Sequence, residues 1–138
     1  DEESDAMTAY EFSIRSEPGR NVLYIEQRGC PSADDLRELR RAFLVEAGRL
    51  RPGFAIVNDQ RFMEPYDDDA MEVAKDLVRL TNRLQASRVI RIVPADVLST
   101  VRLSTTLESA ESSYPSIRVA SPDEAEEALE AFSDSPVP

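Results

Sequence analysis

A short run of apolar residues in the middle of the chain constrains the fold most. Residues 54–57 read Phe-Ala-Ile-Val, follow a Pro-Gly break and end at Asn58 and Asp59. An uninterrupted apolar run of this length is typical of a central strand that is buried on both faces of a sheet. Apolar residues then recur along one helical face from Ala70 to about Leu84. Ligands and partners of α/β domains usually bind where such a strand is followed by a helix, so we expect any function to lie at this junction.

The segments before this strand predict a β-hairpin and a helix. Residues 10–15 alternate apolar with polar, and residues 22–29 form a second strand-like segment after a turn at 18–19. Ser32 is a good N-cap for a helix that ends at Gly48 or at the Pro-Gly break. We therefore expect two antiparallel strands followed by a helix.

The segments after the helix predicted at 70–84 predict two further strands, each followed by a helix. Residues 89–93 read as a strand, and Arg91 within it indicates a position near a sheet edge or a helix end. Residues 97–110 predict a helix, and residues 117–120 predict a short last strand. The residues Ser-Pro-Asp-Glu at 121–124 have the pattern of a capping box, which predicts the start of a final helix.

Strands that alternate with helices imply parallel crossovers, so the fold class is α/β. The prediction is one domain over residues 10–132, with a mixed sheet of about five strands and about four helices in the order ββαβαβαβα. Residues 1–9 read as a disordered lead and residues 133–138 as a tail.

The acidic balance of the chain narrows the kinds of partner. Its formal net charge is −11, which repels phosphate backbones and anionic lipid headgroups. No run approaches the roughly 18 to 20 apolar residues that a membrane span needs, and the first residues are acidic, unlike those of a secretory signal. We therefore expect a cytoplasmic protein with neither nucleic-acid nor membrane partners.

The residue types that most active sites use are scarce. The sequence has no histidine and one cysteine, Cys30, which removes Ser-His-Asp and Cys-His catalysis, most zinc sites and any internal disulfide. Asp59 and Glu64 could act as paired carboxylates, but neighbouring carboxylates are expected by chance among 27 acidic residues. The three aspartates at 67–69 point in different directions, so helix capping explains them better than a metal ion does. We predict no enzymatic activity, no cofactor and no metal site.

The order of the elements resembles that of the STAS domain, the SpoIIAA-like fold of anti-sigma-factor antagonists. The resemblance covers nearly the whole chain and is supported by the helix start Ser-Pro-Asp-Glu-Ala at 121–125 and by one local motif. In that family the third strand ends in an aspartate, and a loop leads to Asp-Ser-Ser-Gly, where one serine is phosphorylated. Here Asp59 matches the strand-end aspartate, and Asp-Asp-Asp-Ala at 67–70 falls where Asp-Ser-Ser-Gly would be. No serine or threonine occurs between Asp59 and Thr81, so a kinase would find no hydroxyl acceptor there except that of Tyr66.

Two functions are compatible with this resemblance. The first is a regulatory module that performs no chemistry and binds a protein, such as a kinase-type anti-sigma factor or another regulator, with a homodimer left open. Aromatic residues and methionine are favoured at interfaces. The residues predicted to bind that partner are Asp59, Phe62, Met63, Tyr66, Asp67, Asp68, Asp69 and Met71.

The alternative is a small-molecule or lipid-binding domain with an apolar pocket under the loop over residues 62–66, since some related domains of this fold resemble lipid carriers. The interior beneath that loop distinguishes the two functions. A filled interior would count against ligand binding, whereas an apolar cavity of several hundred Å³ would count against a pure interaction surface.

Overall fold

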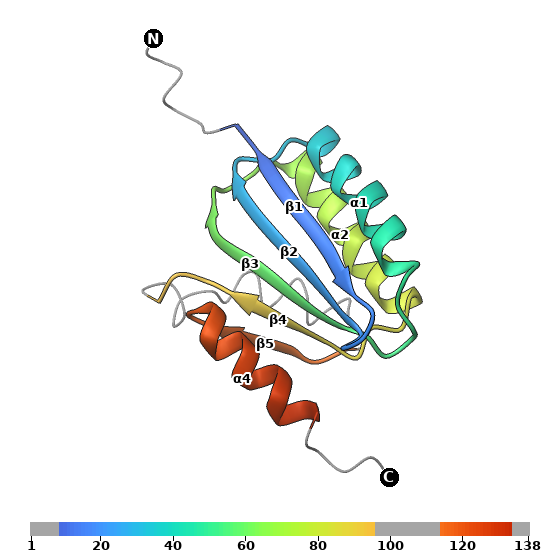
Figure 1. Ribbon diagram of the computed structural model, residues 1–138. Coiled ribbons are helices and arrows are strands. Elements are labelled where there is room, and N and C mark those ends of the chain that lie inside the picture. The colour runs from blue at the N-terminus through green and yellow to red at the C-terminus, as the bar shows by residue number, and fades with distance from the viewer. Residues whose placement is uncertain (1–8, 96–113, 134–138) are drawn as a thin grey trace.

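A five-stranded mixed sheet organises the chain (Figure 1), for which the computed structural model describes residues 9–95 and 114–133. The strands lie side by side in chain order: β1 (Glu11–Glu17), β2 (Val22–Gly29), β3 (Ala55–Met63), β4 (Arg88–Ile92) and β5 (Ser116–Val119). β1 is antiparallel to β2, and the other neighbouring strands are parallel. Helices α1 (Ala33–Ala47) and α2 (Asp68–Arg83) cover one face of the sheet, and α4 (Pro122–Ser133) covers the other (Figure 1).

The predicted fold class and the order of the elements are confirmed for the part of the chain that is described. The predicted helix over 97–110, the lead up to residue 8 and the tail from residue 134 lie outside the described residues. The strand that contains Arg91 lies next to an edge of the described sheet, which is one of the two positions expected for it, because β4 is paired with β3 on one side and with the last strand, β5, on the other. Within the described ranges, none of the helices combines the length and the apolar character that crossing a membrane requires.

The apolar run at 54–57 is buried on both faces of the sheet, as predicted. Ile56 packs on the side of α1 and α2, where Leu39 and Val73 are part of the same buried cluster. Val57 packs on the side of α4 with Ile90 and Leu129. Successive side chains of a strand point to opposite faces, so β3 stabilises both layers of the domain at once.

Strand β3 is longer than the apolar run from which it was predicted. It continues through Asp59 to Met63 because β2 keeps pairing with it, up to the pair formed by Gly29 and Met63. The prediction that Asp59 ends the strand is therefore wrong. If the strand ended at Asp59, the connection to α2 would cover residues 60–67, but it covers only residues 64–67.

The ladder between β2 and β3 contains a β-bulge near its carboxyl end. Glu26 pairs with Asp59, and two residues later Arg28 pairs with Phe62, which is three residues along β3. β3 therefore carries one extra residue at this point, and an extra residue changes which side chains point to which face.

The helices begin at side-chain caps. Ser32 caps α1 in a reciprocal capping box with Asp35, as its position in the sequence predicts. Ser121 accepts a hydrogen bond from the backbone nitrogen of Glu124 at 3.1 Å at the start of α4. In α2 the cap is Asp67, whose Oδ1 accepts from the Ala70 nitrogen at 2.9 Å. From the apolar pattern that begins at Ala70, the sequence predicts Asp68 or Asp69 as the cap, and this prediction is wrong by one or two positions.

Hydrogen bonds attach α4 to the hairpin. The Tyr24 hydroxyl donates to Glu126 Oε2, and Arg20 Nη2 donates to Glu126 Oε1, each at 2.8 Å. Burial, assisted by the Glu126 carboxylate, raises the pKa of Tyr24 to about 12. Burial also acts to raise the pKa of Glu126, but the hydrogen bonds from Tyr24 and Arg20 outweigh it, so that this pKa lies below its usual value.

Candidate functional site

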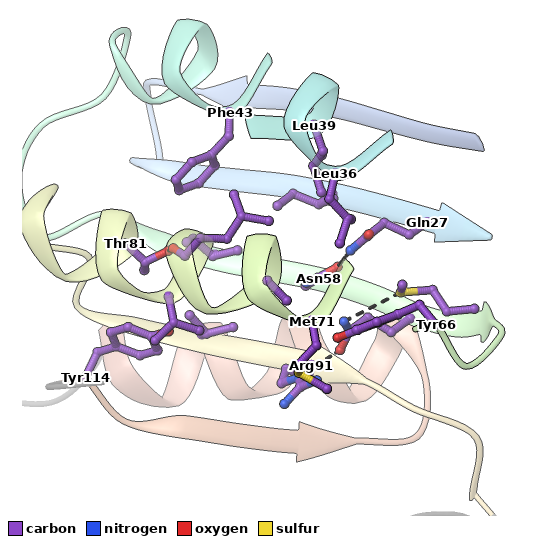
Figure 2. A pocket seen from close by; sticks show the side chains of 18 residues that line it. Gln27, Leu36, Leu39, Phe43, Asn58, Tyr66, Met71, Thr81, Arg91 and Tyr114 are labelled. Atoms are coloured by element: carbon purple, nitrogen blue, oxygen red, sulfur yellow. Dashed lines mark hydrogen bonds between the residues drawn. The ribbon is translucent and has the colours of Figure 1, made fainter. Parts of the chain in front are cut away.

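A cavity of about 220 Å³ lies between the sheet and helices α1 and α2 (Figure 2). Strands β2, β3 and β4 form one wall, and the two helices form the other. The described side chains that line it are Ile25, Gln27, Leu36, Leu39, Phe43, Ile56, Asn58, Gln60, Met63, Tyr66, Met71, Ala74, Leu77, Val78, Thr81, Val89, Arg91 and Tyr114.

The sheet wall of the cavity changes from apolar to polar along the strands. On each of three strands an apolar lining residue is followed two positions later by a polar one: Ile25 by Gln27, Ile56 by Asn58, and Val89 by Arg91. Residues two apart share a face of the sheet, so the polar side chains form a row near the carboxyl ends of the strands. Figure 2 shows Gln27, Asn58 and Tyr66 toward the strand arrowheads and Phe43, Thr81 and Tyr114 at the opposite end.

Hydrogen bonds connect this polar row, which consists of Gln27, Asn58, Gln60 and Arg91. The Tyr10 hydroxyl donates to Gln27 Oε1 at 2.6 Å, and Gln27 Nε2 donates to Asn58 Oδ1 at 2.8 Å. Arg91 Nε donates to Gln60 Oε1 at 2.7 Å. Gln27 is only 6% exposed, so these bonds offset the cost of burying its amide.

Burial raises the pKa of Tyr10 above its usual value, and the carboxylate of Asp35 acts in the same direction. The hydroxyl of Tyr10 therefore keeps its proton at neutral pH and remains a donor to Gln27.

Three of the residues predicted to bind a partner line the cavity. They are Met63, Tyr66 and Met71, and Met63 Sδ lies 3.7 Å from Gln60 Nε2 of the polar row. The bulge in β3 explains the position of Met63, because strict alternation after Asn58 and Gln60 would have pointed Phe62 into the cavity.

Phe62 points outward and is 57% exposed. Its ring lies between two guanidinium groups, with its centroid 5.7 Å from Cζ of Arg28 and 5.1 Å from Cζ of Arg61. These are cation–π distances, so both arginines hold the exposed ring in place.

Asp59 occupies the other face of β3. Its neighbours Asn58 and Gln60 line the cavity, so its own side chain points away from it. It is 8% exposed and forms a bidentate pair with Arg61, from Nε to Oδ1 at 3.0 Å and from Nη2 to Oδ2 at 2.7 Å. The hydrogen bond to Asp59 raises the pKa of Arg61. This ion pair fixes the Arg61 guanidinium group, which lies over the ring of Phe62.

The three aspartates at the start of α2 lie outside the cavity. Asp67 is engaged as the helix cap, whereas Asp68 and Asp69 are exposed in the first turn. Asp67 and Asp69 line an open groove between α2 and α1, opposite three arginines, Arg37, Arg40 and Arg41. In the part of the chain that the structure describes, no three acidic or cysteine side chains are placed to hold a metal ion together.

The polar row could not be identified from the sequence alone. Asn58 follows an apolar stretch and reads as the end of a strand, whereas Arg91 interrupts one. The available signal is that this apolar-to-polar change recurs on three strands, but only the register of the sheet brings those positions together.

Known proteins match this chain at the level of structure. No family model and no curated protein sequence matches it. An uncharacterized DUF3478-family protein with a SpoIIAA-like fold, from Shewanella loihica PV-4, superposes with a TM-score of 0.67 at 13% identity. That superposition covers 88% of this chain and 96% of the other. The chain has the SpoIIAA-like, STAS-type fold.

A second solved structure supports the same STAS-type fold. An anti-sigma factor antagonist from Mycobacterium paratuberculosis superposes with a TM-score of 0.56 at 15% identity, over 88% of this chain and 95% of that one. The predicted resemblance is thus confirmed as a likeness of fold.

Proposed function

We propose that this STAS-type domain is a non-enzymatic regulator that binds a protein partner at the carboxyl end of its sheet. The fold it shares with an anti-sigma factor antagonist supports a partner of the anti-sigma type. The sequence supports a role without chemistry, since it has no histidine and a single cysteine to act as general base or nucleophile. Lone Cys30 is consistent with a cytoplasmic location.

The observation that carries this proposal is the exposed ring of Phe62. Large aromatic side chains and arginines are enriched in the energetically dominant centres of interfaces, and here Phe62 lies between Arg28 and Arg61. The connection from β3 to α2 is four residues long, over 64–67, so the exposed aspartates Asp68 and Asp69 lie at the same end of the domain. We call the surface formed by Phe62, Asp68 and Asp69 the partner surface.

Binding at the partner surface is proposed to be independent of serine phosphorylation. The positions that would carry the phosphorylated serine are aspartates, and no serine or threonine occurs between Asp59 and Thr81. Each aspartate carries one permanent negative charge, less than the ~1.5 to 2 charges of a phosphate group.

Affinity capture with the chain as bait tests the partner surface. A captured protein is identified by mass spectrometry, purified, and titrated against the wild type, Phe62→Ala and the double variant Asp68→Ala/Asp69→Ala. Truncation of an interface centre should weaken binding by about tenfold or more.

The matched control for that titration is Glu127→Ala/Glu130→Ala, which removes the same charge from exposed positions of α4, on the other face of the sheet. It should bind as the wild type does. If Phe62→Ala and Asp68→Ala/Asp69→Ala both bind the captured protein as tightly as the wild type does, the assignment of the partner surface is refuted.

A second candidate function is supported by the cavity itself. The cavity has a volume of about 220 Å³, with aliphatic and polar side chains at opposite ends. A filled interior beneath the loop over residues 62–66 would leave no cavity of this size. A domain that binds a small molecule there, alone or in addition to a protein partner, is the alternative that this cavity favours.

A further inference from the structure

We infer that the cavity binds a small neutral molecule with an apolar body and one carbonyl group, whose oxygen accepts hydrogen bonds from the side-chain amides of Asn58 and Gln60. This inference deepens the second candidate function and rests on it. Three properties of the cavity carry it: the donors that the polar row offers, the acceptors of that row that are already engaged, and the size of the apolar end.

Gln60 offers one hydrogen-bond donor at the polar end. Arg91 Nε donates to Gln60 Oε1 at 2.7 Å, and a guanidinium group can only donate, so this bond fixes the orientation of the Gln60 amide. Within the described chain, the only acceptor for the Gln60 amide nitrogen is the thioether sulfur of Met63 at 3.7 Å, which is a weak one. A ligand oxygen is a better acceptor and can replace it.

Asn58 offers a second donor on the same face of β3. The Tyr10 hydroxyl donates to Gln27 Oε1, so the amide nitrogen of Gln27 is turned toward Asn58 Oδ1, which accepts from it. No residue that the structure describes accepts from the Asn58 amide nitrogen. Asn58 and Gln60 both line the cavity and are two residues apart on one strand, so both amides face the same space.

The ligand group that fits these donors is a neutral acceptor. The side-chain oxygens of Gln27, Asn58 and Gln60 each accept a hydrogen bond already. A carbonyl accepts without bringing a proton that needs an acceptor of its own, whereas a hydroxyl or an amine brings one. Both donors are uncharged amides, and burying an ionised group in apolar surroundings costs far more than burying a carbonyl. The net charge of −11 also disfavours the approach of anions.

The apolar end sets the size of the ligand body. It is formed by aliphatic and aromatic side chains, among them Leu39, Phe43, Ile56 and Leu77. A dry cavity of about 150 Å³ holds one benzene molecule, so by proportion the volume of about 220 Å³ found here holds roughly nine non-hydrogen atoms. Acetophenone, a phenyl ring with a methyl ketone, is of this size.

Titration of the full chain near neutral pH with three probes of equal size, followed by NMR, tests the inference. Acetophenone, isopropylbenzene and benzoate share a phenyl ring and differ in the group attached to it, which is neutral and accepting, purely apolar, or anionic. With acetophenone the side-chain amide signals of Asn58 and Gln60 should shift to saturation, and with isopropylbenzene they should shift clearly less. Benzoate should bind at least about tenfold more weakly than acetophenone, because its charge must be buried.

Three variants separate the carbonyl contact from the apolar body. Gln60→Glu keeps an oxygen for Arg91, which holds the carboxylate ionised, but removes the donor. It should weaken acetophenone binding about tenfold and change isopropylbenzene binding by less than about twofold. Gln85→Glu makes the same chemical change at an exposed position after α2 and should bind both probes as the wild type does. Ala74→Leu places extra carbon atoms in the cavity and should weaken binding of both probes.

Benzoate binding as tight as that of acetophenone would overturn the neutral ligand class while leaving ligand binding in place. Equal effects of Gln60→Glu on acetophenone and isopropylbenzene would overturn the carbonyl contact in the same way. Failure of all three probes to bind would overturn this inference and the second candidate function together. Acetophenone binding that survives unweakened in a folded Ala74→Leu variant would place the site elsewhere and overturn the inference as well.

The comparison of the three probes on the wild type needs no variant, so it decides the ligand class even if Gln60→Glu fails to fold. Partner capture is measured separately, so none of these outcomes depends on the partner surface.

Discussion

Replacing Asp67 by alanine should destabilise the domain by about 1 to 2 kcal/mol. Loss of an N-cap side chain typically costs ~1 kcal/mol, and loss of a negative charge at a helix N-terminus adds about 0.3 to 1 kcal/mol. The cap bond runs from the Ala70 nitrogen to Asp67 Oδ1 at 2.9 Å. Ala70 is 0% exposed, so water cannot easily replace the lost acceptor, which favours the upper part of that range.

Two comparisons separate the cap from the charge. Asp67→Asn keeps a side-chain oxygen that can accept from Ala70 and should lose only the part that is due to the charge. Asp68→Ala removes a neighbouring charge but no cap bond, so it should lower the free energy of unfolding by about 0.3 to 1 kcal/mol. Urea denaturation followed by circular dichroism measures all three as shifts of the midpoint at constant slope. If Asp68→Ala costs as much as Asp67→Ala, the assignment of the cap to Asp67 is refuted.

Three further predictions concern the interior, the attachment of α4 and one turn. Gln27→Leu leaves the Tyr10 hydroxyl without its acceptor and should lower the free energy of unfolding, measured by urea denaturation, by about 1 to 3 kcal/mol. The same substitution should cost clearly less in a Tyr10→Phe background, which has no hydroxyl to leave unpaired. Equal costs in the two backgrounds would show that the bond contributes nothing. Hydrogen bonds from the hairpin lower the folded-state pKa of Glu126, so the stability they add is present above the unfolded-state pKa and is lost as the pH falls through the folded-state value. Denaturation across acidic pH should therefore show a steeper loss for the wild type than for Glu126→Gln, and parallel curves would contradict this. Gly53 has φ of +92°, so Gly53→Ala should cost about 1 kcal/mol or more, whereas Gly19→Ala, in equally open space, should be nearly neutral; equal effects would exclude backbone strain as the cause.

Local signals in the sequence were sufficient for most of the described fold. The apolar run at 54–57 predicts a strand buried on both faces, and Ser32 and Ser121 predict the starts of two helices, because each of these features depends on neighbours within a few residues. The order of elements then restricts the topology, since parallel strands need crossover helices.

The extent of β3 could not be predicted from its own residues. Polar residues such as Asn58 and Asp59 usually mark the end of a strand. Here the strand continues because β2 supplies pairing partners up to Gly29, and because the polar side chains find partners of their own: Gln27 for Asn58, and Arg61 for Asp59. Gln27 lies on the neighbouring strand, and Arg61 lies two residues along β3, at the bulge. Neither composition nor periodicity predicts these contacts.

The bulge also decides which residues serve which proposed site. Strict alternation along β3 would point Phe62 into the cavity and Met63 outward, and the sequence alone groups both in a single surface. The extra residue in β3 reverses this pattern, so Met63 lines the cavity while the ring of Phe62 is exposed between two arginines. Adjacent residues thus belong to two distinct sites, one internal and one on the surface. Phe62→Ala should therefore weaken binding at the proposed partner surface without changing the lining of the cavity, so that the exposed ring can be tested independently of the cavity.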